Sequence, residues 1–473
     1  MVPVLQTRWK LENNKLRYYG LRAYPHTFHS TITVSKKTAQ QIGRMDGDTP
    51  LTQLHVTRGI RALIKQKIVV DADDRVETPS SWEDAHFCTQ CAANDFMIPG
   101  LELNKNGVCP ICTQRERYRY VKNVLPLMCQ LPSAKDSRYD VAVFYTGGKD
   151  SSYLLYYISR VLKLRVLALT WKMPTMSSNA LQSIENAKTA LPEVTFIMEE
   201  VPEGSLTKIY KTVYALQENI CICPSLAYVL FYPLLVKEKV PYLLLGNEPA
   251  QCKNLLYNHL APAAAFRPSV QKGLRLLVNT GRILTAKKPL KKGQFEMLMT
   301  VKNLAFGKHR LLRWLKYQNE PVDNTYQALA AAPEVLTEFK RAIHQSDRHG
   351  RIPALVHMDL AEFSEDRIYN WEKVKRQIEQ QIGWVDVHTQ NKGLHTSCQI
   401  ERCKEHSQFI RFRNCQSRII PFSAIELPIA VTEGCLDREQ AIAELKEHSG
   451  FCLTPPQETQ KMQEVFTKET AVL

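Results

Sequence analysis

Four apolar runs in the middle of the chain have the length and residue types of buried β-strands. They are rich in valine, leucine, isoleucine and aromatic residues, and they cover 141–145, 164–170, 194–198 and 241–245. The stretches between them place apolar residues at helical spacing. Strands that alternate with helices predict a parallel sheet with right-handed crossovers. We therefore expect an α/β domain over residues 131–275.

The pattern changes on both sides of this domain. Near the start, short strands are expected at 16–19 and 31–34, a helix capped by Ser35, a second helix within 54–68, and a strand at Val69. Residues 1–80 therefore read as a small separate module. From about residue 276 to 473 the chain becomes helical and rich in loops, which predicts a C-terminal region for a substrate or a partner.

The first strand of the α/β domain runs into Thr146-Gly147-Gly148-Lys149-Asp150-Ser151-Ser152, followed by a helical pattern. Two glycines permit backbone angles that are closed to other residues. The free N–H groups and positive dipole of the helix N-terminus then favour an anion. Lys149 adds a point charge, and Thr146 and Ser151 add hydroxyl donors. An ordinary tight turn needs only one glycine, so the pattern predicts a phosphate site. Its spacing is not that of a Walker P-loop.

Composition places the chain among soluble globular proteins. Its 473 residues are 44% hydrophobic and 23% charged, which allows two to four domains. The first nine residues show no signal segment, and no run reaches the ~18 apolar residues of a membrane span. Thirteen cysteines then indicate a reducing, cytoplasmic setting, with metal or catalytic use rather than disulfides.

The net charge of +15 is concentrated in one segment. Residues 267–316 contain many lysines and arginines but a single acid, Glu296. Such a segment binds nucleic acid, for example tRNA, or another anionic surface, or it forms an ordinary solvated face. No alternation of aromatic and basic residues accompanies it, so both interpretations stay open. An oligomer is compatible with this composition.

Two C-x-x-C hooks precede the α/β domain, in the segment 81–130. Cys88 and Cys91 are followed after seventeen residues by Cys109 and Cys112, and Asn106-Gly107 supplies a turn before the second hook. This spacing predicts a Cys₄ zinc ribbon. Four thiolates leave no coordination position open, so the Zn²⁺ is expected to be structural.

The loop at 146–152 closely resembles the S-G-G-x-D-S loop of the PP-loop, or N-type, ATP pyrophosphatases, with Thr146 in place of serine. The resemblance implies an adenine nucleotide alpha-hydrolase-like sheet and cleavage of ATP between its α- and β-phosphates. It further implies that Thr146, Gly147, Gly148, Lys149, Asp150, Ser151 and Ser152 bind ATP. By the same analogy Thr170 and Gly246 contact the nucleotide, Asp150 helps to hold Mg²⁺, and Lys149 stabilises the departing pyrophosphate.

Further resemblances concern the flanking regions. The ribbon, with Pro99 and Gly107-Val108-Cys109, is similar to ribbons of some thiolases and of N-acetyl sugar amidotransferases. The segments 384–386, 394–398 and 437–441 resemble C-terminal elements of that amidotransferase branch. Residues 32–70 loosely resemble winged-helix-like modules of the PqqD-like group, which recognise precursor peptides.

The remaining cysteines have two interpretations. Cys221 and Cys223 stand just before a helix, where a thiol pKa is lowered and reactivity favoured, although the amidotransferase branch has C-x-x-C here. Buried structural cysteines are the commoner alternative. An iron–sulfur or persulfide role needs further thiols, of which Cys252 is nearest in sequence. Four more candidate ligands lie within twelve positions, but their spacing is not a distinctive hook: His395, Cys398, Cys403 and His406.

These observations predict an ATP-dependent enzyme that adenylates a substrate oxygen and forms AMP. The main expectation is displacement of AMP by nitrogen, as in amidotransferases of surface-polysaccharide or natural-product biosynthesis, with ammonia from a partner glutaminase subunit. The first alternative is a sulfur transferase that acts on tRNA or a peptide through Cys221, Cys223 or Cys398. The second is a non-catalytic ATP- or peptide-binding adaptor, against which the intact Lys149, Asp150 and Ser151 weigh.

Overall fold

A computed structural model describes most of the chain, in a set of segments divided by gaps. The described residues are 1–21, 31–53, 56–115, 136–216, 221–258, 268–308, 320–386, 398, 400–415, 417–454, 457 and 460. They divide into two compact units. The first comprises Met1–Arg119, Lys253–His259 and Glu405–Thr454, and the second comprises Tyr120–Cys252, Leu260–Lys404 and Pro455–Leu473.

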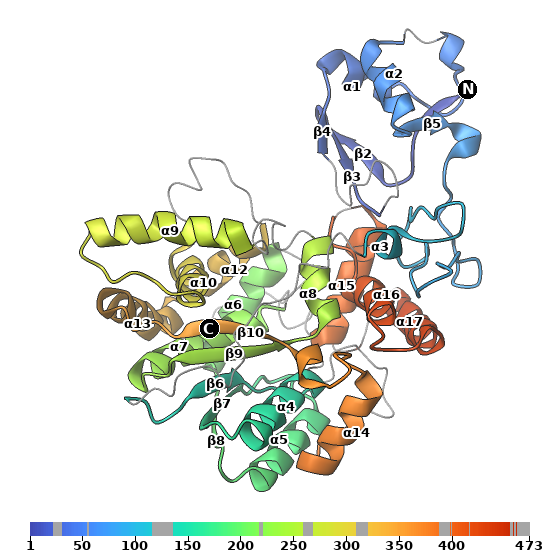
Figure 1. Cartoon of the computed structure of the whole chain (residues 1–473). Helices are drawn as coiled ribbons and strands as arrows, with labels where there is room; N and C mark the ends of the chain where they lie inside the picture. Colours follow the sequence, from blue (N-terminus) through green and yellow to red (C-terminus); the bar gives the residue numbers. More distant parts are fainter. Residues whose placement is uncertain are drawn as a thin grey trace, which may run out of the picture. The chain divides into compact units, whose positions relative to one another are not determined.

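A five-stranded parallel sheet forms the centre of the second unit (Figure 1). Its strands are β6 (Val141–Phe144), β7 (Val166–Trp171), β8 (Thr195–Glu199), β9 (Tyr242–Asn247) and β10 (Ala354–Asp359). Their order in space is β10-β9-β6-β7-β8. The chain thus moves outward from β6 in one direction and then returns to β9 on the other side of it. The switch point, where ligands bind in such sheets, lies between β6 and β9.

Helices cover both faces of this sheet (Figure 1). One group consists of α4 (Lys149–Tyr156), α5 (Ser178–Ala190) and α14 (Trp371–Ile382). The other group consists of α6 (Glu203–Leu216), α7 (Cys223–Lys237), α10 (Gln294–Phe306), α12 (Glu320–Ala330) and α13 (Leu336–His349). A further helix, α9 (Pro268–Leu284), follows the gap after residue 258. Among the described residues, none of the helices has both the length and the apolar content needed to cross a membrane.

The sequence pattern predicted four of the five strands and the helix after β6. The strand β10 was missed, because it lies more than a hundred residues after β9 within a mainly helical region. Its run Ala354-Leu355-Val356 is short, and the polar His357 and Asp359 interrupt the apolar signal.

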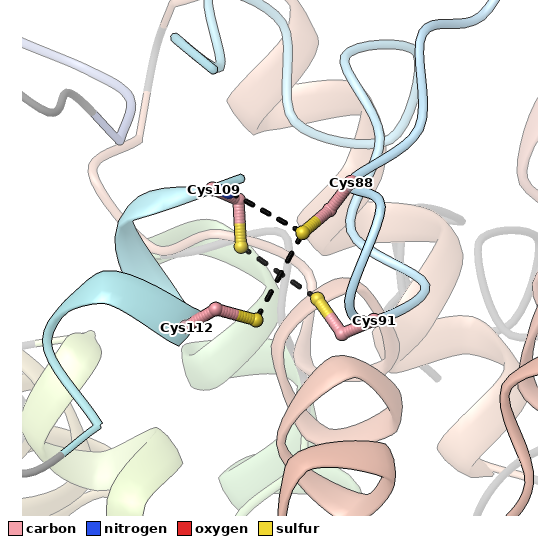
Figure 2. Close-up of side chains that lie close together, drawn as sticks. All are labelled: Cys88, Cys91, Cys109 and Cys112. Carbon is pink, nitrogen blue, oxygen red and sulfur yellow. Dashed lines mark hydrogen bonds between the residues drawn. The ribbon is translucent and has the colours of Figure 1, made fainter. Parts of the chain in front are cut away.

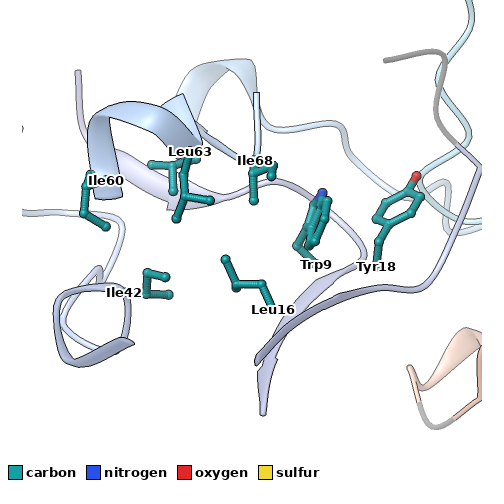
Figure 3. Close-up of a cluster of buried hydrophobic side chains, with 8 residues drawn as sticks. Trp9, Leu16, Tyr18, Ile42, Ile60, Leu63 and Ile68 are labelled. Carbon is teal, nitrogen blue, oxygen red and sulfur yellow. The ribbon is translucent and has the colours of Figure 1, made fainter. Parts of the chain in front are cut away.

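The first unit begins with a small module of two antiparallel sheets. One pairs β1 (Pro3–Leu5) with β5 (Val69–Asp71), and the other contains β2 (Trp9–Glu12), β3 (Lys15–Tyr18) and β4 (Thr31–Thr33). Two helices, α1 (Lys36–Ile42) and α2 (Arg58–Lys65), pack beside them. Figure 3 shows the apolar side chains that meet between these elements. The expected cap is present, since Ser35 Oγ accepts a bond from the Thr38 N–H at 3.1 Å.

The rest of the first unit consists of the cysteine hooks and helices from both ends of the chain. The helices are α3 (Pro110–Thr113), α16 (Phe422–Thr432) and α17 (Arg438–Leu453), with parts of α8 (Pro249–Tyr257) and α15 (Ile400–Arg413). Buried Arg8 joins the small module to α15, because its guanidinium donates to the Phe412 carbonyl and lies 4.2 Å from the Phe412 ring centroid.

A buried charge network joins three helices of the second unit. Asp347 on α13 accepts bonds from Arg282, from Lys287 at 2.9 Å and from Lys302 at 3.0 Å. Burial alone would raise the pKa of Asp347, but the hydrogen bonds from the three cations outweigh it and lower that pKa. Asp347 therefore stabilises the fold in its ionised form.

We predict that Asp347→Asn lowers the free energy of unfolding by about 3 kcal/mol at pH 7, because Arg282 remains buried without its counter-charge. The folded-state pKa is depressed, so this stability is present above the unfolded value near 4 and is lost as the pH falls below it. Urea unfolding at pH 7 and at about pH 2.5, well below the unfolded pKa, measures both effects. Glu338→Gln, which breaks an exposed pair with Arg341 on the same helix, is the control. Equal destabilisation at both pH values would contradict the account.

Candidate functional site

The loop from Thr146 to Ser151 leaves β6 at the switch point and leads into α4. Gly147 has φ 72°, and a Cβ built there would lie 2.4 Å from the Ala180 carbonyl oxygen. No other residue fits this position without moving backbone. Gly148 is the N-cap of α4 and offers no side chain to its N–H groups. The predicted anion site therefore has the expected backbone.

Hydroxyl groups hold the loop in this shape. Thr146 Oγ1 lies 3.2 Å from Ser151 Oγ, and Ser151 donates to the Gly148 carbonyl at 3.1 Å. From a distant part of the chain, the Trp384 indole donates to the Gly147 carbonyl at 3.0 Å. The two hydroxyls thus bond within the loop, whereas the sequence analysis assigned them only to the anion.

Lys149 is held between two carboxylates at the carboxyl edge of the sheet. Its ammonium lies 2.9 Å from Asp150 Oδ1 and 3.4 Å from Glu248 Oε2, at the end of β9. Burial would lower the pKa of Lys149, but the charges of Asp150 and Glu248 outweigh it and raise that pKa. The lysine is therefore a fixed cation, and an anionic ligand would have to compete with two carboxylates for it.

Aromatic and amide side chains complete this charge cluster. Tyr369 donates to Asp150 Oδ1 at 2.7 Å, and Gln251 donates to Asp150 Oδ2 at 2.9 Å. The Lys149 ammonium also lies 4.5 Å from the ring centroids of Tyr369 and Trp371. Burial and the nearby carboxylates keep the pKa of Tyr369 well above its usual value, so its hydroxyl stays a donor.

Local sequence patterns did not predict these partners of the loop. Tyr369 and Trp371 stand about 220 positions after Lys149, around the helix cap Asn370. Nothing in the local spacing of such residues distinguishes them from ordinary core aromatics, so only the fold reveals them.

Three other predicted nucleotide contacts serve the packing around the loop. Ser152 is completely buried and donates to the Tyr145 hydroxyl. Thr170 is also buried and donates to the Tyr145 carbonyl at 2.7 Å. At Gly246 a Cβ would lie 3.2 Å from Leu360 and 3.4 Å from Leu154, so this glycine lets α4 lie close to β9. Their contact with a nucleotide stays a prediction.

Three thiols from two distant parts of the chain converge in the second unit. Cys221 and Cys223 stand at the start of α7, and Cys398 pairs through an isolated β-bridge with Met176, after β7. The sequence predicted a lowered thiol pKa here, but hydrogen bonding to the thiols of Cys221 and Cys398, together with burial, instead raises the pKa of Cys223 well above its usual value. The sequence suggested each cysteine separately but gave no sign that they meet.

Polar side chains surround these thiols. Thr175 Oγ1 lies 3.2 Å from Cys398 Sγ, and the Tyr210 hydroxyl lies 3.9 Å from Cys223 Sγ. Burial, and then the nearby thiols, raise the pKa of Tyr210 well above its usual value. Because α7 follows β8 and leads back into β9, its first residues belong to the same carboxyl edge as the Thr146–Ser151 loop.

The other predicted ligands are not tested. His395 and the side chains of Cys252 and Cys403 lie outside the described residues. His406 lies on α15, in the first unit, whereas Cys398 belongs to the second.

The two cysteine hooks come together as predicted (Figure 2). The sulfur atoms of Cys88, Cys91, Cys109 and Cys112 all lie within 4.8 Å of one another. The distance is 3.6 Å between Cys91 and Cys109 and 3.8 Å between Cys88 and Cys112. Zinc–sulfur bonds of about 2.3 Å in a tetrahedron place the sulfurs about 3.8 Å apart. The set therefore has the size for a single ion.

The surroundings of the hooks support this use. The Asn106-Gly107 turn is present, with Gly107 N–H bonded to the Asn104 carbonyl at 2.9 Å. Cys88 Sγ accepts bonds from the backbone N–H groups of Gln90 and Cys109. Arg438, at the start of α17, donates to the carbonyls of Cys88 at 2.8 Å and Cys91 at 3.2 Å. Positive charge beside the hooks favours four thiolates.

Comparison with known proteins identifies no family. No family model matches the chain, and no curated protein matches it. Among solved structures, the chain is similar to the U34-tRNA thiolase NcsA from Methanococcus maripaludis with its [4Fe-4S] cluster. The two share 13% identity, and the match covers 64% of this chain and 90% of that one with a TM-score of 0.21. So low a score carries no inference, and the functional argument rests on the site geometry.

We predict that Glu248→Gln makes Lys149 more reactive toward an amine-acylating reagent at pH 8–9. Loss of one carboxylate lowers the Lys149 pKa, and each unit lowered gives about tenfold more neutral amine. Mass spectrometry of tryptic peptides measures the rate, with exposed Lys172 of the same chain as the internal reference. An unchanged ratio of the two rates would show that Glu248 does not govern the lysine.

We further predict one tetrahedral metal ion per chain at the hooks. Metal analysis of Cys112→Ser should show it lost or weakly held, whereas Cys435→Ala, at another buried cysteine, should retain it. X-ray absorption should give a single sulfur shell near 2.3 Å. Metal–metal scattering that disappears in Cys112→Ser would instead indicate a cluster at the hooks.

Proposed function

We propose that this protein is an ATP-dependent enzyme of the PP-loop pyrophosphatase type, which adenylates a substrate oxygen and then transfers sulfur to the activated carbon. The loop supports the first step. Backbone N–H groups at Gly148 and the start of α4 bind the phosphates of ATP, and Lys149 stabilises charge on the departing pyrophosphate.

Asp150 and Glu248 are the residues that would hold Mg²⁺ beside these phosphates. Both offer carboxylate oxygens, which Mg²⁺ prefers, and both lie beside Lys149 at the loop. Bound Mg²⁺ would supply charge neutralisation for the phosphates. Tyr369 and Gln251 hold the Asp150 carboxylate by one hydrogen bond to each oxygen, and so orient it. Trp384 helps to hold the loop in place through its bond to the Gly147 carbonyl.

The convergence of Cys221, Cys223 and Cys398 carries the choice of sulfur over nitrogen. Amination by ammonia from a glutaminase does not require thiols, whereas sulfur transfer does, and these three lie at the same carboxyl edge of the sheet as the Thr146–Ser151 loop. Only the ribbon cysteines, among the described residues, are compact enough for a single ion, so the second group suits a persulfide or a wider iron–sulfur cluster. We assign the ribbon to structural zinc.

A persulfide donor first transfers its outer sulfur atom to the thiolate of one cysteine, which leaves a persulfide on that cysteine and a thiol on the donor. The substrate oxygen attacks the α-phosphorus and pyrophosphate leaves. The outer sulfur of a persulfide on one cysteine then attacks the activated carbon, and AMP leaves with the oxygen. A second thiol of the group attacks the cysteine sulfur, which forms a disulfide and releases the thiolated product. A cellular thiol reduces the disulfide.

We predict that the full chain, with ATP, Mg²⁺, a ³⁵S-labelled persulfide (sulfane-sulfur) donor and a reducing thiol, incorporates ³⁵S into either the RNA or the peptide fraction of a desalted cell extract. Cys398→Ser should lose at least about tenfold of the incorporation while AMP formation continues, whereas Lys149→Ala should lose both. Cys435→Ala is the control. The sulfur proposal would be wrong if ammonia is incorporated instead, with formation of AMP, and if this incorporation is unchanged in Cys221→Ser, Cys223→Ser and Cys398→Ser. That result would favour amination.

A further inference from the structure

Helix α9 is docked in the second unit with its polar side inward. Asn279 exchanges two hydrogen bonds with the backbone of Leu290, and Arg282 is buried against Asp347. These two residues lie three positions apart, on one face of the helix. A surface helix of a globular protein normally buries its apolar face instead.

The opposite side of α9 carries large aliphatic residues in the open. Leu276 and Ile283 are seven positions apart, as are Leu277 and Leu284, so all four share one face. Leu277 is 70% exposed and Leu284 81% exposed. With Leu274, α9 contributes five of the ten exposed large apolar side chains among the described residues. Such a concentration on one helix marks an interaction surface.

The segment that carries this surface is rich in positive charge. The segment 268–293 contains seven lysines and arginines and no aspartate or glutamate. Lys272, Lys288 and Lys291 are exposed, and Asp347 already takes the charges of Arg282, Lys287 and Lys302. The partner of α9 is therefore anionic and also has an apolar layer to receive the leucines.

These requirements select one partner class. We propose that α9 binds the surface of an anionic membrane, with its leucines among the acyl chains and its lysines at the lipid headgroups. A second copy of α9 would bring like charges together. An RNA would be stacked on aromatic residues, and 268–293 has none. The helix lies in the plane of the membrane, since its 17 residues span only about 25 Å and carry charge throughout.

The test is co-sedimentation of the full chain with vesicles of phosphatidylglycerol and phosphatidylethanolamine, compared with phosphatidylcholine alone. The chain should bind the anionic vesicles and be released by high salt. The double variant Leu277→Asn/Leu284→Asn should bind at least about tenfold more weakly, because each leucine loses its transfer from water. Its control is Val161→Asn/Leu453→Asn, which changes two exposed apolar residues elsewhere and should bind like the original chain.

Charge is tested separately by Lys272→Glu/Lys291→Glu, which should also weaken binding to anionic vesicles several-fold. Equal vesicle binding by the original chain and the leucine variant would overturn the proposal. The proposal would also be overturned if the chain binds total tRNA but not vesicles, and only the lysine variant loses this tRNA binding. A dimer that the leucine variant dissociates, with no binding to vesicles, would identify a second copy as the partner and also overturn it.

Discussion

Gly147 leaves β6 with a positive φ, and any side chain there would meet the Ala180 carbonyl oxygen at 2.4 Å. This close approach of loop and α5 fixes how the chain enters α4, and so where Lys149 and Asp150 stand. The order of strands adds the other half of the constraint. Because β9 returns beside β6, it brings Glu248 to the lysine. The charge cluster depends on these two features of the backbone.

Both ion pairs and hydrogen bonds hold the cluster of Lys149, Asp150 and Glu248 together. The two carboxylates keep the ammonium charged although it is buried, and Tyr369 and Gln251 supply donors to Asp150. An ion pair in such surroundings stabilises a fold only modestly, since desolvation opposes the Coulomb attraction. Such ionisable groups with perturbed pKa values are typical of functional sites, so their position beside a helix N-terminus favours a functional role over a stabilising one.

The sequence predicted the parts of the fold that local patterns encode. Strands β6 to β9, the glycine turn, the Ser35 cap and both cysteine hooks follow from apolar runs, turn residues and spacing. The features that the sequence did not predict depend on contacts between residues far apart in the chain. Tyr369, Trp384 and β10 reach the site from beyond residue 350, and Cys398 reaches Cys223 from another segment. No local periodicity encodes such meetings, because they arise only when the chain closes.

The proposed function requires that the Thr146–Ser151 loop directs cleavage of ATP between its α- and β-phosphates. ³¹P NMR of ATP and Mg²⁺ with the full chain and a heat-treated, desalted cell extract, in which pyrophosphatase and adenylate kinase are inactive, measures the products, with the Lys149→Ala chain as the blank. The signals gained over this blank should be those of AMP and pyrophosphate in equal amounts. A gain of ADP and inorganic phosphate instead would contradict it.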